Sequence, residues 1–287
     1  MPGVAVVTDS TSYLPRDLVA ARGIHEVSLY VSEGAGHRRE LDIADYARFY
    51  ADLRAASDLP TTSQPSIGDF TAVYEPLLAA GADVVSVHIS GGISGTVESA
   101  RQAAAEVAGR YPGRRIEVVD SAVSAGALGL VVLAAARSAE TGGDVEAVVG
   151  AANAAVAAMQ FWFAVDTLEY LRRGGRIGAA QAWLGGALKI KPILTLDGQI
   201  TPIERVRTSR RAFERMVEFL RSRHADGADA WVVQHVQSPE VADRLVEQGR
   251  AIFGSEPAFV SEVGPVIGAH VGPGLVGVGG IPRALTG

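Results

Sequence analysis

The sequence predicts an α/β fold: a mostly parallel sheet with helices on both faces, then an α+β domain, with a ligand between the two. In the first half, short apolar runs alternate with helical patterns. The runs Val84–Ile89 and Ile116–Val119 each precede a serine-bearing turn and an Ala-rich helix. This alternation is typical of parallel strands joined by crossover helices. In the second half, Asp197-Gly198 separates two β-rich runs and predicts a hairpin.

Apolar periodicity and capping signals predict the elements of the first half. Ser66 and Asp69 match a capping box, so we expect a helix that starts there and stops near Gly81. The other expected elements are strands at Val4–Val7 and Glu26–Val31 and helices at Pro15–Arg22, Ile43–Ala56 and Thr96–Ala108.

The second half is expected to have an α+β arrangement. The pattern predicts strands at Phe161–Val165, Trp231–Val236 and near Phe259, a hairpin over Pro192–Arg207, and helices at Thr167–Arg172, Ala179–Leu188, Arg210–Arg223 and Pro239–Phe253. We therefore expect two closely packed domains, residues 1–160 and residues 161–287, with the ligand site in a cleft between them.

Composition narrows the class of protein. A net charge of −6 over 287 residues gives no global basic field for nucleic acid. The absence of cysteine excludes disulfides and thiolate metal sites. The longest apolar run, Ala125–Ala136, is about half a membrane span, so no integral membrane segment is expected. The N-terminus does not resemble a signal peptide, and a cytoplasmic location is expected.

The segment Ser90–Thr96 predicts an anion site. It is rich in glycine and hydroxyl groups, follows an apolar strand and precedes a helix. Unpaired N–H groups and the helix dipole favour a carboxylate or phosphate at such a turn. Ser94 is placed either to cap the helix or to donate to a ligand. Similar hydroxyl-rich turns occur near residues 10, 63 and 121, where capping is the alternative role.

Several motifs of enzymes and nucleotide-binding proteins are absent, or occur without the secondary structure that their function requires. Gly272-Pro273-Gly274-Leu275-Val276-Gly277 has the form of a dinucleotide fingerprint, but no βαβ unit follows it. Neither lysine belongs to a phosphate-binding Walker loop, and no nucleophile elbow surrounds Ser90 or Ser94. No two of the six histidines have the spacing of a helical metal site, so neither a metal nor a cofactor is expected.

Two features allow both a structural and a functional interpretation. The arginines of Arg172–Arg176 and Arg205–Arg211 form either a solvated basic face or a docking patch for an acidic partner or a phosphorylated ligand. His270 lies between glycine-rich segments that allow close approach of a ligand, although a structural role is equally compatible with this spacing.

The ordered set of motifs resembles the DegV family over the whole chain, from residue 8 to about residue 280. The matching segments are Thr8–Pro15, Thr62–Ser66, Ile89–Thr96, Asp120-Ser121, Leu168–Ile177, Ile190–Leu194, Val206–Thr208 and Gly264–His270.

The resemblance implies a fatty-acid-binding protein without catalytic residues of its own. It implies an acyl chain in an apolar tunnel and a carboxylate held by Thr62 or Ser63, by Ser94 with the Gly95 amide, and by His270. It further implies that the protein presents the carboxylate to a separate ATP-dependent fatty acid kinase, which makes acyl-phosphate for phospholipid synthesis. Arg176 and Arg207 match the arginines of the family that face the kinase, in basic segments expected to lie away from the hydroxyl turns.

Two other classes of function stay open at this point. A serine hydrolase would use Ser94 and His270 with Asp120 or Asp9, but the nucleophile elbow is missing. A sugar-phosphate or phosphotransfer domain would use His88 as phosphoacceptor, but His88 lies inside an apolar strand run, where a packing role is expected.

Overall fold

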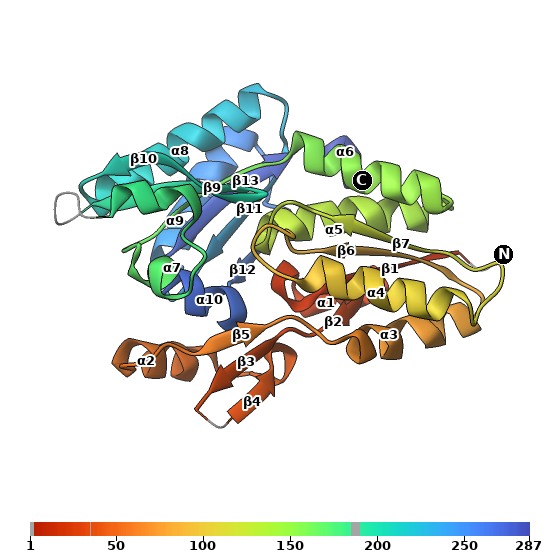
Figure 1. Ribbon diagram of the computed structural model, residues 1–287. Helices are drawn as coiled ribbons and strands as arrows, with labels where there is room; N and C mark the ends of the chain where they lie inside the picture. The colour runs from red at the N-terminus through yellow and green to blue at the C-terminus, as the bar shows by residue number, and fades with distance from the viewer. Residues whose placement is uncertain (1–2, 35, 185–189) are drawn as a thin grey trace.

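The computed structural model describes residues 3–34, 36–184 and 190–287, and these residues form three β-sheets (Figure 1). The helix expected at Ala179–Leu188 is a 3-10 helix over Gly178–Trp183 (η3), and residues 185–188 of that prediction lie outside the described residues. None of the helices in these ranges is long and apolar enough to cross a membrane.

The first sheet confirms the predicted parallel arrangement. Its strand order is β2-β1-β6-β7, and every pair is parallel. Helices α3 and α4 cover one face, and α5 and α6 cover the other (Figure 1). The elements are β1 (Val4–Asp9), β2 (His25–Val27), β6 (Asp83–His88), β7 (Ile116–Asp120), η1 (Ser10–Ser12), α1 (Arg16–Ala21), α3 (Ile67–Ala79), α4 (Thr96–Ala108), α5 (Ala125–Glu140) and α6 (Val145–Ala158).

A small antiparallel sheet departs from the prediction. Its order is β4-β3-β5, with β3 at Tyr30–Glu33, β4 at Gly36–Arg39 and β5 at Thr61–Ser63; η2 (Glu40–Asp42) and α2 (Tyr46–Ala55) follow β4. The single strand expected at Glu26–Val31 is therefore wrong, because the chain leaves the first sheet at Ser28. There the Ser28 hydroxyl accepts from Leu41 N–H, and Leu29 N–H donates to the Ser10 hydroxyl. At Ser28 and Leu29, these hydrogen bonds to side chains take the place of the backbone hydrogen bonds of a sheet.

The second sheet is antiparallel except for one pair of strands, in the order β10-β9-β8-β13-β11-β12. It confirms the hairpin at Asp197-Gly198, where Gly198 has a φ of 70°. The elements are β8 (Gln160–Ala164), β9 (Lys191–Asp197), β10 (Gln199–Val206), β11 (Ala230–His235), β12 (Phe259–Glu262), β13 (Val276–Ile281), α7 (Glu169–Arg173), α8 (Ser209–Ala225), α9 (Pro239–Phe253), α10 (Pro265–Val271) and η4 (Arg283–Leu285).

Strand β13 was not expected, because it contains three glycines and glycine weakens a strand pattern. It nevertheless lies in the middle of the second sheet, between β8 and β11. A Cβ atom at Gly277 would come within 2.7 Å of the Phe161 ring on β8. Glycine is therefore needed on β13 to leave room for a neighbouring aromatic side chain.

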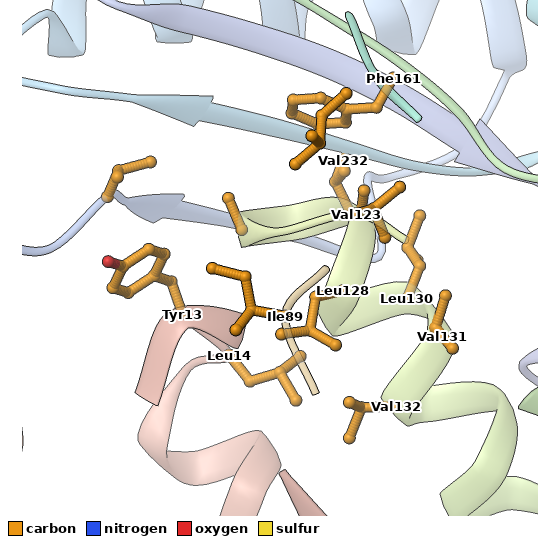
Figure 2. Close-up of a cluster of buried hydrophobic side chains, with 14 of the residues drawn as sticks. Tyr13, Leu14, Ile89, Val123, Leu128, Leu130, Val131, Val132, Phe161 and Val232 are labelled. Carbon is orange, nitrogen blue, oxygen red and sulfur yellow. The ribbon is translucent and has the colours of Figure 1, made fainter. Parts of the chain in front are cut away.

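Helix α5 joins the two halves of the molecule. All twelve residues from Ala125 to Ala136 are buried. The helix packs on β1 and β6 of the first sheet and on β11 and β13 of the second. Figure 2 shows Leu128 beside Ile89 and Leu14, with Phe161 and Val232 of the second sheet nearby. One apolar cluster therefore runs through both halves, and the division at residue 160 stays a prediction.

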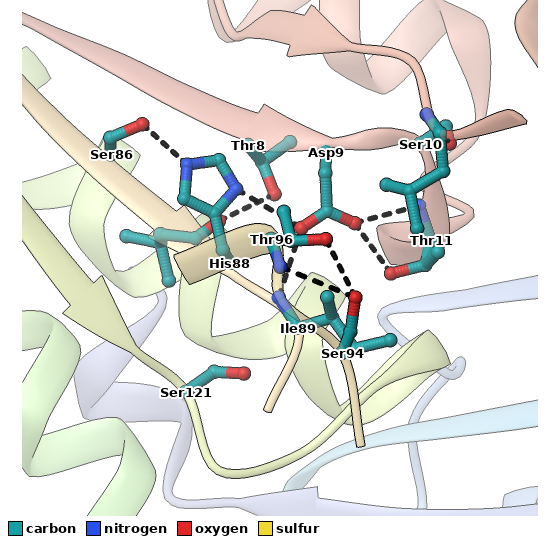
Figure 3. A network of polar contacts seen from close by, with 12 residues as sticks. Thr8, Asp9, Ser10, Thr11, Ser86, His88, Ile89, Ser94, Thr96 and Ser121 are labelled. Carbon is teal, nitrogen blue, oxygen red and sulfur yellow. Dashed lines mark hydrogen bonds and ion pairs between the residues drawn. The ribbon is translucent and has the colours of Figure 1, made fainter. Parts of the chain in front are cut away.

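A buried polar network fixes the ends of β1 and β6 (Figure 3). Asp9 accepts from Thr11 N–H at 3.0 Å and from Ile89 N–H at 2.9 Å. His88 bonds to Asp9 through Nδ1 at 3.0 Å and to Ser86 through Nε2 at 2.6 Å. The His88 side chain has no exposed surface. This network sets the path of the chain from Ile89 toward the turn that carries Ser94.

Candidate functional site

The structure contains an apolar cavity between the two halves of the chain. It encloses about 910 Å³ of space, part of it open to solvent. Its walls come from the turn after β6, the start of α5, the strands β8 to β10, and the helices α7 and α10. The apolar lining residues include Ile89, Val123, Ala125, Ala127, Phe161, Phe163, Leu171, Leu196, Ile200, Val266 and Leu275.

Three of the four predicted hydroxyl turns reach this cavity. Thr62 and Ser63 of β5 line it, and so do Ser94 and Ser124, the latter in the turn after β7. Other hydroxyl groups of these turns bond within the protein: the Ser10 hydroxyl donates to Glu40 at 2.5 Å, and the Ser121 hydroxyl donates to Val123 O at 3.1 Å. The hydroxyl-rich composition of a turn therefore predicts more ligand-binding residues than the structure places at the cavity, because turns use the same side chains for internal hydrogen bonds.

Thr62 and His270 form a pair across the cavity wall. Thr62 Oγ1 lies 2.7 Å from His270 Nε2, although 208 residues separate them in the sequence. Nδ1 of His270 is buried and has no hydrogen-bond partner within the described residues. Burial, with a contribution from the positive charge of Arg176, lowers the pKa of His270 to about 4. The imidazole is therefore neutral at physiological pH and can donate one hydrogen bond.

Ser94 lies at the start of α4, as the sequence predicted. Its hydroxyl is 2.8 Å from Thr96 Oγ1 and accepts from Thr96 N–H at 3.3 Å, but the N-cap residue of α4 is Gly95, so Ser94 lies one residue before the cap (Figure 3). Gly95 precedes the first turn of this 13-residue helix. A Cβ atom there would come within 2.7 Å of the amide of Gln64, which also lines the cavity. Gln64 was not singled out from the sequence.

Arg176 is closer to the site than the sequence indicated. It is exposed, lines the cavity, and donates to Gly174 O at 2.9 Å and to Ile93 O at 3.4 Å. The expectation that Arg176 lies away from the hydroxyl turns is wrong, because the loop after α7 packs against the turn that carries Ser94. Arg176 is therefore a cation at the mouth of the cavity.

Arg207 is remote from Arg176. Gly178, two residues after Arg176, packs against Ile200 O near the start of β10, whereas Arg207 is exposed just beyond the other end of that strand. At about 3.3 Å per residue, the strand separates the two ends by on the order of 20 Å. The two arginines that the resemblance grouped together therefore occupy different parts of the surface.

Glu40 anchors the helix that carries His270. Its carboxylate accepts from Val266 N–H at 2.8 Å and from the Tyr13 hydroxyl at 2.9 Å. The Tyr13 hydroxyl in turn accepts from Ile267 N–H at 3.2 Å. These bonds satisfy N–H groups in the first turn of α10. No local pattern indicates this role, because Glu40 and α10 are more than 220 residues apart.

The alternative catalytic arrangements do not assemble. Ser94 bonds to Thr96 and His270 bonds to Thr62, so the two are not hydrogen-bonded to each other. Asp9 bonds to His88 and Thr11, while Asp120 accepts from Gly91 N–H and Ala122 N–H. The complete burial of His88 also disfavours it as a phosphoacceptor. Among the described residues, no cluster of three potential ligand side chains could hold a metal ion.

Comparisons with known proteins identify relatives over nearly the whole chain. The model of the DegV family, described as uncharacterised, matches residues 3–283. A DegV domain-containing protein of Streptomyces coelicolor is 42% identical over 281 residues, covering 96% of this chain and 97% of that protein. The structure of a DegV family protein from Thermus thermophilus, described by its fatty acid binding, has a TM-score of 0.87 and 36% identity, covering 98% and 99% of the two chains. The structure of Bacillus subtilis DegV, described as a fatty acid binding protein, also has a TM-score of 0.87 and 36% identity, covering 97% and 99%.

Glu40 is expected to make stability depend on pH. Burial raises the pKa of its carboxyl from the ordinary 4.5 to about 7. The stabilising contribution of the protonated group is therefore complete below pH 4.5 and is lost as the pH rises through 7, by about 3 kcal/mol in total. Glu40→Gln should remove this dependence from the free energy of unfolding measured with denaturant at each pH. The exposed Glu33, changed to Gln, serves as the control, and a parallel response of both variants would contradict the assignment.

Gly174 is expected to keep the imidazole of His270 buried. A Cβ atom at Gly174 would overlap Nδ1 of His270, while its φ of −77° suits alanine. Gly174→Ala should push the ring toward solvent and raise the pKa of His270 from about 4 toward 6.5, as followed by NMR titration. Gly175→Ala meets no atom within 4 Å and should leave this pKa low, although its φ of +71° costs stability. An unchanged pKa in Gly174→Ala would show that the contact does not control the ring.

Proposed function

The chain belongs to the DegV family, and we propose that it binds a long-chain fatty acid and presents the carboxylate to a fatty acid kinase. The acyl chain occupies the apolar cavity. Thr62, Ser63, Ser94, Gly95 and His270 surround the carboxylate. The protein acts as a carrier in this scheme, and the kinase supplies ATP and the phosphoryl-transfer chemistry.

The observation that carries the proposal is a group of polar side chains at the mouth of an otherwise apolar cavity. Thr62 contacts His270, Gln64 packs on Gly95, and Arg176 bonds to the carbonyl oxygen beside Ser94. These contacts place the polar side chains together at the mouth of the cavity. By contrast, Gln234, which also lines the cavity, has its amide bonded to Gly126 N–H and Ser261 and is not available to a ligand.

These groups suit a carboxylate better than a neutral ligand. The N-terminal N–H groups of α4 carry partial positive charge, and Arg176 supplies a full charge at the mouth. His270 is neutral, so it donates a hydrogen bond without the cost of burying a second charge. Each CH₂ group of the ligand that enters the apolar wall contributes about 0.8 kcal/mol. The chain therefore provides most of the affinity, and the polar groups fix which end lies at the mouth.

Delivery to a kinase is supported by the exposure of Arg176, which also lines the cavity. A carboxylate beside the exposed Arg176 would be accessible to a second protein without release of the acyl chain from the cavity. Arg207, on a separate exposed segment, has a position suited to contact with such a partner. Exposed basic residues in an acidic protein can steer an acidic partner to this face.

Loss of a carboxylate donor should weaken fatty acid binding. Ser94→Ala and His270→Ala are each expected to reduce the binding free energy by about 1–3 kcal/mol, because a buried oxygen loses its partner. The double variant should lose less than the sum if both donors share the same oxygens. Affinity is measured by displacement of a fluorescent fatty acid. Ser222→Ala and His224→Ala, exposed on α8, are the controls, and wild-type affinity in both cavity variants would reject the head-group site.

Arg176 and Arg207 should separate binding from delivery. Arg207→Ala is expected to retain bound fatty acid and to slow acyl-phosphate formation by the kinase, more strongly as salt is added. Arg176→Ala is expected to lower both retention and rate, because its guanidinium faces the head group. Bound lipid by mass spectrometry and coupled kinase rate are measured side by side, with exposed Arg101→Ala as control. Lipid loss in Arg207→Ala would place that residue in the binding site and contradict its docking role.

A further inference from the structure

A second hollow adjoins the cavity on the outside of the molecule. We call it the outer cleft; it encloses about 940 Å³ and is more open to solvent than the cavity. It lies between the turn after β7, the end of α6, and strands β8 and β9. Val123, Phe161 and Leu196 line both the cavity and the outer cleft. These three side chains therefore separate the two spaces.

Phe161 is the largest member of this partition, and its position is fixed by glycines. Cβ atoms at Gly277 and Gly279 of β13 would each come within 2.7 Å of its ring. The ring therefore occupies space that side chains on β13 would otherwise fill. Its carbonyl oxygen accepts from the Thr195 hydroxyl at 2.9 Å, which ties β8 to β9 at this point. Figure 2 shows the ring near Val123 and Val232.

One wall of the outer cleft is suited to the methyl end of an acyl chain. That wall is formed by apolar Ala122, Val156, Ala157, Met159 and Trp162, while Ser121, Gln160, Thr195 and Asp197 make another part of the lining polar. None of the residues placed around the carboxylate belongs to its described lining. A chain that crossed the partition would therefore bring its methyl end into the outer cleft while its carboxylate stayed at the mouth.

We propose that Phe161 limits the length of the fatty acid, by closing the cavity against an outer cleft that would otherwise accept the methyl end of a longer chain. This inference rests on the proposed function. A chain that fills the cavity ends at the ring, and each further CH₂ group has no apolar space. Removal of the ring joins the two hollows, and each CH₂ group buried in the outer cleft then raises affinity about fourfold.

Phe163 provides a matched control on the same strand. Phe161 and Phe163 are both 7% exposed and both line the cavity, but only Phe161 lines the outer cleft. Phe163→Ala therefore enlarges the cavity without opening the partition. Phe161→Leu is a milder second variant that keeps an apolar side chain at the partition if Phe161→Ala fails to fold, and thermal unfolding identifies such a failure.

The experiment loads delipidated wild-type protein and each variant with an equimolar series of saturated fatty acids from myristate to behenate. Bound lipids are extracted and quantified by mass spectrometry. Phe161→Ala should shift the distribution to longer chains, with up to about fifteenfold enrichment for each added pair of CH₂ groups beyond the wild-type limit. Phe161→Leu should shift it in the same direction by less, and Phe163→Ala should leave the upper limit unchanged.

Two outcomes overturn the inference in distinguishable ways. If wild type and the Phe161 variants bind fatty acid with the same length distribution, or if Phe163→Ala lengthens it equally, Phe161 does not set the limit and the proposed function stands. If delipidated wild type takes up no fatty acid from the series, the proposed function fails, and the length limit fails with it.

Discussion

The burial of α5 between two sheets is the constraint on which the rest of the molecule depends. A helix with apolar residues all around needs protein on every side, and here each sheet covers part of its surface. Its residues differ in size along its length. Ala125, Gly126 and Ala127 come first, and Leu128, Leu130 and Val131 follow. Small side chains at the first turn leave the layer unfilled at that end, and Ala125 and Ala127 line the cavity that results.

The polar side of the cavity depends on contacts between distant parts of the chain. Helix α10 carries His270, but its first turn is held by Glu40 and Tyr13, and the Tyr50 hydroxyl donates to Val263 O at 2.6 Å just before it. Glu40 and Tyr50 lie between β4 and β5 of the small sheet, which also supplies Thr62, whereas Tyr13 follows β1 of the first sheet. The small sheet and its connections, with Tyr13, thus position both members of the Thr62–His270 pair.

Local signals in the sequence were sufficient for part of this structure. The bounds of α4 and α9 agree with those predicted, and the capping box of α3 is present, because periodicity and capping act within one turn of helix. Strands β4, β5 and β13 were missed, because charged, hydroxyl or glycine content hides the apolar alternation of a strand. At the site, the position of Ser94 followed from local pattern, whereas the proximity of Thr62 to His270 and of Arg176 to the cavity is a tertiary property. The roles of Gln64, Gly174 and Glu40 could not be predicted from the neighbouring sequence, because each role depends on a contact with a residue that is distant in the chain.

The position of β13 also affects the order in which the protein can be completed during synthesis. It is the last of the described strands in the chain, yet it lies between β8 and β11, which are made earlier. Until it inserts, both neighbours present unpaired edges, and such edges template pairing with other chains. Pairing over long sequence separations is slow to form. The second sheet is therefore incomplete until β13 has been made, and chaperones have the most to contribute during that interval. The wall of the cavity that the second sheet provides is completed only when β13 has inserted.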